Sequence, residues 1–326
     1  MRFIIPFTTR AKVIIQDLWK HNLGWDDPIE LLHLRESWLT WVGELPTLTK
    51  LQFPRAYTPA SADNPSAIRE LHVFSDASER AYGSVAYLRT TDDQGQVILT
   101  FVLARSRVAP RKCLSIPRLE LCAALTGAQL GKVIQTELTI PVHKVTFWSD
   151  STTVLYWLTS ESCRYKVFVG TRVAEIQTLT EMSEWRCVES SHNPADHITR
   201  GLRLTELAGH HQWSSGPAFL IQSPDQWPSM PKTEGEPDCN ELLKSVFIAT
   251  VSVPSSSLPD PSQFHTWQEL VLATVKSLHG VATTDTDSPT EASEYIEAEK
   301  LLLAQAQMES FPIAWADSYG VLVTSN

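Results

Sequence analysis

The sequence contains no apolar run that approaches the roughly 20 residues a helix needs to cross a bilayer. The first ten residues, from Met1 to Arg10, hold too short an apolar stretch for a secretory signal. Only five cysteines occur in 326 residues, and they form no CxxC pair. We therefore expect a chain without a disulfide scaffold and without a membrane partner. Its expected location is intracellular, either cytoplasmic or nuclear.

Basic residues are scarce at one end of the chain. Residues 1–69 carry 8 basic and 7 acidic side chains, and residues 70–201 carry 14 of each. Residues 202–326 carry 5 basic and 16 acidic side chains, so they hold an acidic excess of 16 − 5 = 11 within the net charge of −10. An acidic chain as a whole argues against nucleic-acid binding. The neutral central part weakens that objection, because four of its acids serve one expected site and leave a net positive surface.

The apolar pattern predicts three segments. Residues 1–67 contain two tryptophan-rich helices, at 11–21 and 31–42, and then a linker at 56–67. Residues 68–206 form the main α/β domain. Residues 207–326 form an acidic connector, irregular and rich in Pro-Ser steps such as those at 254–261, with two amphipathic helices at 266–278 and 289–311. The sequence shows no internal repeat.

Within residues 68–206 the pattern predicts a mixed sheet of five strands with helices packed on it. The strands are expected at 71–75, 82–89, 97–105, 143–149 and 185–188, and the helices at 117–137, 151–159 and 166–180. A hairpin turn joins the second and third strands. Pro117 suits the first turn of the longest helix, and Ser115 is expected to cap it.

Four carboxylates stand in separate local contexts in this domain. Asp76 and Asp150 end predicted strands, at edges where catalytic groups often sit. Each also has a plainer interpretation, since Asp76 suits a turn and Asp150 suits a helix N-cap. Asp196 follows Asn-Pro-Ala, a rigid turn, and is also a candidate cap.

Glu120 lies on the longest predicted helix. It shares a face with Ala123, Ala124 and Gly127, a stripe of small residues that lets the helix lie close to the sheet. A glutamate on such a face points into protein, which is costly unless the carboxylate is paired or coordinated. Favourable interaction with the helix dipole accounts for its first-turn position but not for its buried face.

Taken together, the four acids indicate a site for divalent cations. Four clustered carboxylates repel one another and raise the pKa of at least one member. Two cations relieve that repulsion, and ligands that are all oxygens favour Mg²⁺ or Mn²⁺ over zinc. Two such ions about 3.5–4 Å apart clamp a phosphodiester for hydrolysis. The pattern therefore predicts a metal-dependent nuclease with Asp76, Glu120, Asp150 and Asp196 as catalytic ligands.

Five motifs carry a resemblance to a known family. They are Phe-Ser-Asp-Ala-Ser at 74–78, Ile-Pro-Arg-Leu-Glu-Leu at 116–121, Trp-Ser-Asp-Ser-Thr-Thr-Val-Leu-Tyr-Trp-Leu at 148–158, Phe-Val-Gly-Thr-Arg-Val-Ala-Glu-Ile at 168–176 and Asn-Pro-Ala-Asp-His-Ile-Thr-Arg-Gly at 193–201. In order and spacing they resemble the ribonuclease H domain of BEL/Pao long-terminal-repeat retrotransposon Pol polyproteins. The resemblance implies a ribonuclease H-like fold and cleavage of RNA in an RNA–DNA hybrid.

The resemblance extends outward from this domain. Residues 5–26 look like the reverse-transcriptase thumb and connection of such polyproteins, and residues 293–311 resemble the segment before the integrase zinc domain. The polymerase palm, the zinc ligands and the integrase acids are absent from the sequence. The chain thus resembles the middle of a Pol polyprotein, and the reverse-transcriptase and integrase portions are expected partners. The sequence departs from the family pattern at two places. The loop before Asp196 reads Val-Glu-Ser-Ser-His, where the family more often has Val-Pro followed by a polar turn. Thr171 stands where the family commonly has Asn.

Basic and histidine residues near these motifs have two interpretations each. Arg105, Arg107, Arg111 and Lys112 form a basic run that is either a groove for hybrid phosphates or a solvated loop. His192 and His197 flank the fourth acid, and each either assists proton transfer or is a surface polar residue. A zinc site built from them with His210, His211 and Cys239 lacks the CxxC half and is rejected. Trp148, Trp157 and Trp185 are expected in the core.

Three functions remain open. The first is a metal-dependent ribonuclease H. The second is an aspartic peptidase, because this Pao region is sometimes labelled a peptidase. That chemistry needs Asp-Thr-Gly or Asp-Ser-Gly, and neither tripeptide occurs in the sequence. The third is an inactive or domesticated remnant that binds nucleic acid.

Overall fold

The computed structural model describes residues 2–52, 56–57, 67–209, 211–229, 241–242, 258–278 and 292–310. The chain divides into two units, Met1–Lys244 and Ser245–Asn326, and each is described by itself. Most of the expected linker at 56–67 lies outside the described residues, as does the first half of the Pro-Ser run at 254–261.

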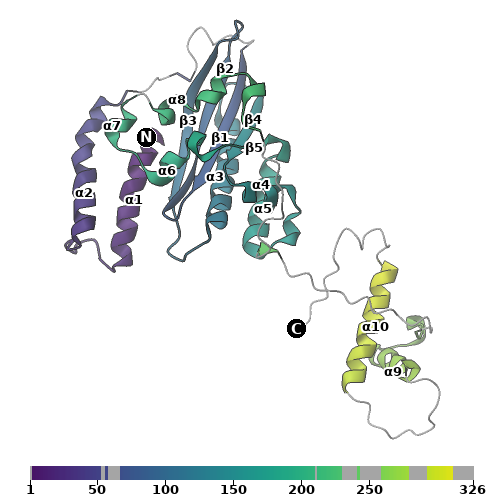
Figure 1. The fold of residues 1–326 in the computed structure, drawn as a ribbon. Helices are drawn as coiled ribbons and strands as arrows, with labels where there is room; N and C mark the ends of the chain where they lie inside the picture. Colours follow the sequence, from purple (N-terminus) through teal and green to yellow (C-terminus); the bar gives the residue numbers. More distant parts are fainter. Residues whose placement is uncertain are drawn as a thin grey trace. The chain divides into compact units, whose positions relative to one another are not determined.

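A mixed sheet forms the centre of the first unit (Figure 1). Its strands are β1 (Ile68–Ala77), β2 (Ala81–Thr91), β3 (Val97–Val108), β4 (Lys144–Ser149) and β5 (Trp185–Cys187). Within the described residues the order is β3-β2-β1-β4-β5. The pairs β1–β2 and β2–β3 are antiparallel, whereas β1–β4 and β4–β5 are parallel. The five expected strands and the mixed α/β class are confirmed.

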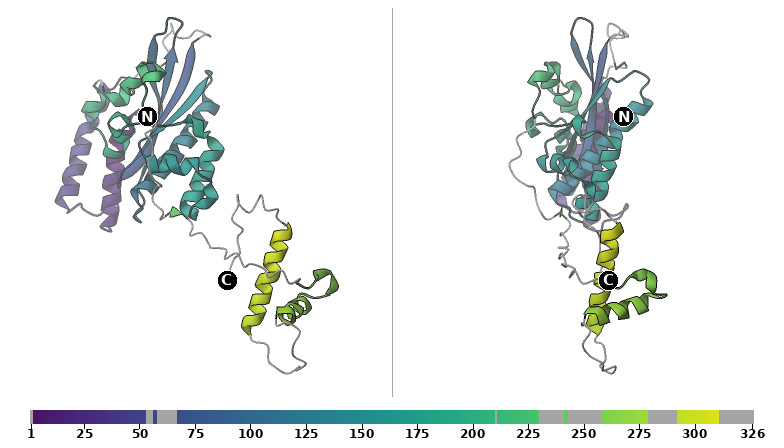
Figure 2. Two further views of the ribbon diagram at one scale, coloured as in Figure 1. Left: turned by 45° about the vertical axis from the view of Figure 1, so that its right-hand side comes forward. Right: turned by 90° about the vertical axis from the view of Figure 1, so that its right-hand side faces the viewer.

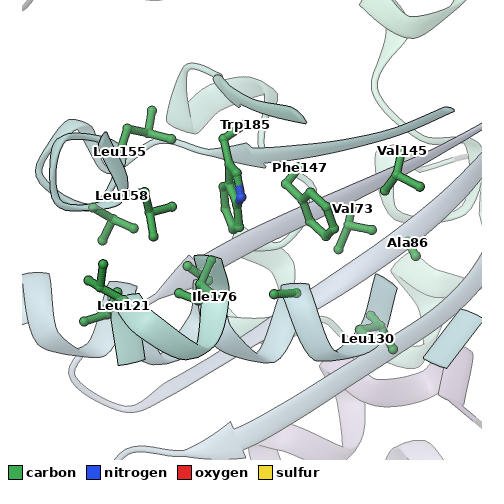
Figure 3. Packing of buried hydrophobic residues seen from close by; sticks show 14 of the residues in the cluster. Val73, Ala86, Leu121, Leu130, Val145, Phe147, Leu155, Leu158, Ile176 and Trp185 are labelled. Atoms are coloured by element: carbon green, nitrogen blue, oxygen red, sulfur yellow. The ribbon is translucent and has the colours of Figure 1, made fainter. Parts of the chain in front are cut away.

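One face of the sheet carries three helices: α3 (Ile116–Glu137), α4 (Thr152–Thr159) and α5 (Val167–Leu179). Short 3-10 turns, Ser162–Arg164 and Met182–Glu184, lie in the connections. Figure 3 shows the core on this side, where Phe147 and Trp185 lie among aliphatic side chains that include Val73, Leu130 and Ile176. Phe147 and Trp185 stack with ring centroids 5.0 Å apart.

Helices from both ends of the unit cover the opposite face (Figure 2). They are α1 (Ile5–Lys20), α6 (Asp196–Arg200), α7 (Leu204–Leu207), α8 (Gln212–Ser215) and the 3-10 turns Arg2–Ile4, Ala218–Ile221 and Pro224–Gln226. Their core includes Phe74, Trp148 and Trp213. Because successive strand residues point to opposite faces, Val73 and Phe147 belong to one core, and Phe74 and Trp148 to the other.

The helix α2 (Leu32–Glu44) runs beside α1, and the 3-10 turn Leu45–Lys50 follows it. A stacked pair joins Phe7 of α1 to Trp41 of α2, with centroids 4.8 Å apart. The Arg10 guanidinium also donates to Glu44 at 2.8 Å. Both helices expected in residues 1–67 are present, but the first begins at Ile5 and not at residue 11.

Three local expectations need correction. The third strand was expected to end at Arg105, but β3 also includes Arg107, because that strand stays paired with β2 as far as Ala81 and Val108. Ser115 stands at the N-cap of α3 but its side chain accepts no capping hydrogen bond. The α4 cap is Ser151, which accepts from the Val154 amide, so Asp150 is not used as a cap.

The second unit contains the two helices expected near the C-terminal end. They are α9 (Trp267–Leu278), preceded by the turn Pro261–Gln263, and α10 (Ala292–Ser310). They pack through Leu270, Val271, Val275, Ala298 and Leu302. Among the described residues, no helix combines the length and apolarity that crossing a membrane requires. Cys113, Cys122, Cys163 and Cys187 are free thiols, whereas Cys239 lies outside the described residues.

Candidate metal centre

Three acids from three elements meet at one edge of the sheet. One carboxylate oxygen each from Asp76, Glu120 and Asp150 lies within 4.8 Å of the others. Asp76 is near the end of β1, Glu120 is in the second turn of α3, and Asp150 directly follows β4. The structure thus brings together three of the four acids that the sequence singled out.

Strand pairing explains why the two aspartates meet. β1 and β4 are parallel neighbours, and their last paired residues are Ser75 and Ser149. Asp76 and Asp150 are the next residues along each strand, so both stand at the same carboxyl edge. This is a consequence of register, because a shift of one residue in either strand would turn one side chain to the other face.

Close packing of α3 on the sheet brings Glu120 to the same edge. The Ser84 hydroxyl of β2 donates to the Ala123 carbonyl at 2.9 Å, which ties helix to sheet. A Cβ at Gly127 would collide with the Ser75 hydroxyl of β1. Only glycine therefore permits this approach, and Glu120 is 9% exposed as a result. The expected buried glutamate on a small-residue face is confirmed.

Burial and mutual repulsion dominate the electrostatics of the cluster. Burial raises the pKa of Glu120 to about 9, with further increases from the charges of Asp76 and Asp150. Burial also raises the pKa of Asp76 to about 7, where the Thr199 hydroxyl partly opposes the increase and Asp150 and Asp196 add to it. Without a cation, the cluster holds protons at pH values where ordinary carboxyls have lost them.

Two hydroxyl groups orient the aspartates, and no local sequence pattern pointed to either. The Thr199 hydroxyl of α6 donates to Oδ2 of Asp76 at 2.6 Å. The Ser190 hydroxyl donates a short hydrogen bond to Oδ2 of Asp150. Ser190 lies in the Val-Glu-Ser-Ser-His loop before Asp196, so this loop supplies a partner to an acid. Neither hydroxyl is adjacent in sequence to the acid it contacts.

Asp196 stands next to this cluster but is not one of the three converging acids. It is the first residue of α6, and its Oδ1 accepts from the Arg200 side chain at 2.7 Å. The loop before it is anchored to the sheet, because the Asn193 amide donates to the Ser75 carbonyl at 3.0 Å. Asp196 is near enough to raise the pKa of Asp76. The rigid turn expected at 193–195 therefore positions Asp196 beside the site.

The donor set fits a divalent cation. Oε2 of Glu120 and Oδ1 of Asp150 are buried and have no hydrogen-bond partner in the part of the chain that is described. A buried carboxylate oxygen without a partner is costly, and a cation removes that cost. The three donors are all carboxylate oxygens, which suits Mg²⁺ or Mn²⁺ better than zinc.

The predicted basic run lies on both the strand and the loop beside this edge. Arg105 pairs across the sheet with Ser84, whose hydroxyl contacts α3, so Arg105 and Arg107 point to the α3 side of edge strand β3. Arg111 and Lys112 follow in the loop before α3, and all four residues are exposed. The run is thus a charged margin on the same side of the sheet as the helix that carries Glu120.

The two flanking histidines have different surroundings. His192 is exposed, and its Nδ1 lies 3.7 Å from the Glu189 carboxylate. His197 packs against His211, with ring centroids 4.5 Å apart, and its Nε2 lies 3.3 Å from Oε1 of Gln212. Burial, followed by the charge of His211, lowers the pKa of His197. His197 therefore contacts α8 through its ring.

The strand order and the acids at the carboxyl edges of β1 and β4 define a ribonuclease H-like α/β domain. Residues 1–151 match the family model described as the Pao retrotransposon-like RNaseH-like domain. The resemblance to Pao retrotransposons that the motifs carry is thereby confirmed over this part of the chain. The matched range includes Asp76, Glu120 and Asp150 and ends before Asp196. The comparison with curated proteins found no match.

Several solved structures are similar to part of this chain. The N-terminal RNase H domain of Rv2228c from Mycobacterium tuberculosis is 12% identical, with 40% of this chain and 90% of that chain covered and a TM-score of 0.26. LC11-RNase H1 in complex with an RNA/DNA hybrid is 13% identical, with 40% and 92% covered and a TM-score of 0.26. The foamy viral protease-reverse transcriptase in complex with an RNA/DNA hybrid is 11% identical, with 48% and 23% covered and a TM-score of 0.21.

Proposed function

We propose that this protein is a metal-dependent ribonuclease H that hydrolyses the RNA strand of RNA–DNA hybrids. The observation that carries the proposal is the convergence of Asp76, Glu120 and Asp150 within 4.8 Å, with two buried carboxylate oxygens left without partners. A purely structural acid cluster would be expected to pair these oxygens with donors. The match of residues 1–151 to a retrotransposon RNaseH-like family supports the same function.

The four acids have distinct parts in this proposal. The cations are held by Asp76, Glu120 and Asp150. Asp196 becomes the fourth ligand when its carboxylate turns from Arg200 toward Asp76. Two divalent ions bound there supply Lewis-acid activation of water and stabilise charge on the leaving oxygen. The hydroxyls of Thr199 and Ser190 hold the carboxylates in position.

Substrate contacts are assigned to the basic margin. Arg105, Arg107, Arg111 and Lys112 are exposed on or next to the α3 side of β3, where they bind backbone phosphates of the hybrid. Selection of the RNA strand depends on its 2′-hydroxyl groups, which are what distinguish RNA from DNA at a given site. The partners of the protein are accordingly the hybrid itself and the reverse-transcriptase and integrase portions of a Pol polyprotein.

The decisive experiment is cleavage of a hybrid by the full chain. With Mg²⁺ or Mn²⁺ and a hybrid labelled on both strands, we expect cuts in the RNA strand alone. Asp76→Asn, Glu120→Gln and Asp150→Asn should each lose more than the roughly 100-fold that loss of an outer-shell partner costs. Glu175→Gln removes an exposed carboxylate on α5 and should leave the rate unchanged.

Two outcomes would contradict the proposal. Equal cleavage by the wild type and by Asp76→Asn would mean that another protein in the preparation cuts the RNA. Tight hybrid binding without cleavage in either metal would favour the second candidate, an inactive or domesticated remnant that binds nucleic acid. The aspartic peptidase is disfavoured because the required Asp-Thr/Ser-Gly tripeptides are absent from the sequence.

A further inference from the structure

Two arginines are held against one aromatic ring near the start of α3. The guanidinium carbons of Arg118 in α3 and Arg172 in α5 lie 4.9 Å and 3.7 Å from the centroid of the Phe168 ring. Arg172 also donates to the Phe168 carbonyl at 2.8 Å. A cation–π contact of this kind holds the flat face of a guanidinium against the ring and leaves the N–H groups at its edge able to donate hydrogen bonds. Both guanidinium groups are thus pre-positioned.

A carboxylate from far along the chain lies on the first of these arginines. Glu241 accepts from Nε of Arg118 at 2.7 Å and from Nη2 at 2.9 Å, each through a different oxygen. This two-point geometry is the one an arginine offers equally to a carboxylate or a phosphate. The Glu241 side chain is 11% exposed and that of Arg118 is 28% exposed. Glu241 therefore covers the hydrogen-bonding edge of Arg118 that an anionic ligand would use.

Few backbone contacts hold Glu241 in place within the described residues. Its carbonyl accepts from the Lys166 amide at 2.8 Å. An isolated antiparallel bridge joins the next residue, Leu242, to Tyr165. A single bridge contributes much less than a strand in a sheet, so an anion that displaces Glu241 breaks little backbone pairing among the described residues.

Position and charge point to the kind of anion. Arg118 and Glu120 are two residues apart on α3, about 3 Å along the helix axis. The arginine thus stands at the same end of α3 as one of the converging acids. The segment that supplies Glu241, residues 202–326, carries 16 acidic and 5 basic side chains. Glu241 therefore lies on a basic side chain at the end of α3 that carries Glu120, although Arg118 and Glu120 project from different sides of that helix.

We propose that Arg118, Phe168 and Arg172 form a subsite for a backbone phosphate of a nucleic acid, and that Glu241 occupies this subsite until the nucleic acid displaces it. The inference rests on the proposed function, because it takes the substrate of the neighbouring acids to be a nucleic acid. Glu241 then acts as an internal competitor. Glu241 weakens substrate binding through Arg118 and does not contact the metal ligands.

The test is binding of a fluorescein-labelled RNA–DNA hybrid to the full chain across a range of salt concentrations. In Glu241→Ala, Arg118 is released, and we expect binding about fivefold tighter at low salt. The slope of log affinity against log salt should steepen by roughly one unit, the value of one added phosphate contact. Glu241→Gln, which keeps the shape of the side chain, should give a smaller gain. The double variant Arg118→Ala/Glu241→Ala should lose the gain.

A matched control and a separate activity assay make the result decisive. Glu137→Ala removes an exposed acid at the other end of α3 and should change neither affinity nor slope. The inference is overturned if Glu241→Ala binds the hybrid with wild-type affinity and slope, even if it melts at a lower temperature. It is also overturned if this variant binds no nucleic acid. Cleavage is measured in parallel. If Glu241→Ala binds the hybrid more tightly but neither the wild type nor any variant cleaves it, the proposed nuclease activity is wrong and the phosphate subsite is supported.

Discussion

The Thr199 hydroxyl oxygen lies 2.6 Å from Oδ2 of Asp76 and 2.9 Å from the Asp196 carbonyl oxygen, so both acceptors share its single proton. One side chain of α6 therefore fixes an acid of β1 and the first turn of its own helix. Because Thr199 is 7% exposed, water does not readily replace it. The relationship couples the loop that carries Asp196 to the cluster of the other three acids.

Replacement of Thr199 should weaken metal binding without removing a ligand. Thr199→Val keeps the volume but deletes the donor, so Oδ2 of Asp76 loses its hydrogen bond and the pKa of Asp76 rises further. We expect about 10–100-fold weaker Mg²⁺ affinity, measured by titration of hybrid cleavage with Mg²⁺. Thr199→Ser retains the hydroxyl and should stay close to wild type. Equal loss in both variants would mean that the methyl group, and not the hydroxyl, matters.

The metal-free protein should become less stable as the pH rises. The raised pKa values of Asp76, about 7, and Glu120, about 9, mean that the folded state binds their protons more tightly than the unfolded chain does. Stability is then lost from about pH 4, where unfolded carboxyls ionise, through pH 7 and on to pH 9. In EDTA we expect the melting midpoint at pH 8.5 to lie about 5 °C or more below that at pH 5.5.

Neutral variants should flatten this pH dependence. Asp76→Asn and Glu120→Gln remove the carboxyl groups that titrate, so each should melt higher than wild type at pH 8.5 in EDTA. A wild-type midpoint that does not fall with pH, or variants that melt lower than wild type, would contradict the burial of repelling acids.

Added cation should stabilise the wild type and not the variant. Mg²⁺ binds the folded cluster but has no organised site in the unfolded chain, so it raises the melting midpoint in proportion to the logarithm of its concentration. Asp76→Asn lacks one ligand and should show a much smaller increase. The measurement is a thermal melt at pH 8 with Mg²⁺ from zero to millimolar. An equal increase in both proteins would place the cation elsewhere.

Gly127→Ala should damage both stability and activity. The new Cβ collides with the Ser75 hydroxyl, so α3 must move from the sheet and carry Glu120 with it. Overpacking of this kind costs about 1–3 kcal/mol. Gly43→Ala is the control, because Gly43 lies in α2 and a Cβ there meets nothing within 4 Å. That change should stabilise by about 0.5–1 kcal/mol. Denaturant unfolding and the cleavage rate are the two measurements.

Loss of Glu70 should be costly, because it leaves a charge buried. Arg89 and Glu70 pair at 2.6 Å, with side chains 8% and 11% exposed. Glu70→Ala leaves the Arg89 charge buried and unpaired, which costs about 3 kcal/mol or more. Lys20→Ala breaks a pair whose lysine is 46% exposed and should cost less than about 1 kcal/mol. Equal urea midpoints for the two variants would contradict this difference.

Local sequence determined most of the secondary structure. The alternation of apolar residues along the strands and the helical spacing in α3 predicted those elements to within about three residues, because each pattern has to bury its own face. Glu120 on its small-residue stripe was predicted for the same reason. Pairing across the sheet was not local: β3 continues through Arg107 because β2 offers it a partner as far as Ala81.

The sequence by itself determined which acids stand at strand ends and on a buried helix face, since burial and strand period act over a few residues. Only the tertiary structure decided that three of them converge while Asp196 pairs with Arg200. It alone also placed Thr199 on Asp76, Ser190 on Asp150 and Glu241 on Arg118. Each of these contacts joins segments at least 40 residues apart, and their distances depend on sheet register and helix packing, which no local pattern encodes.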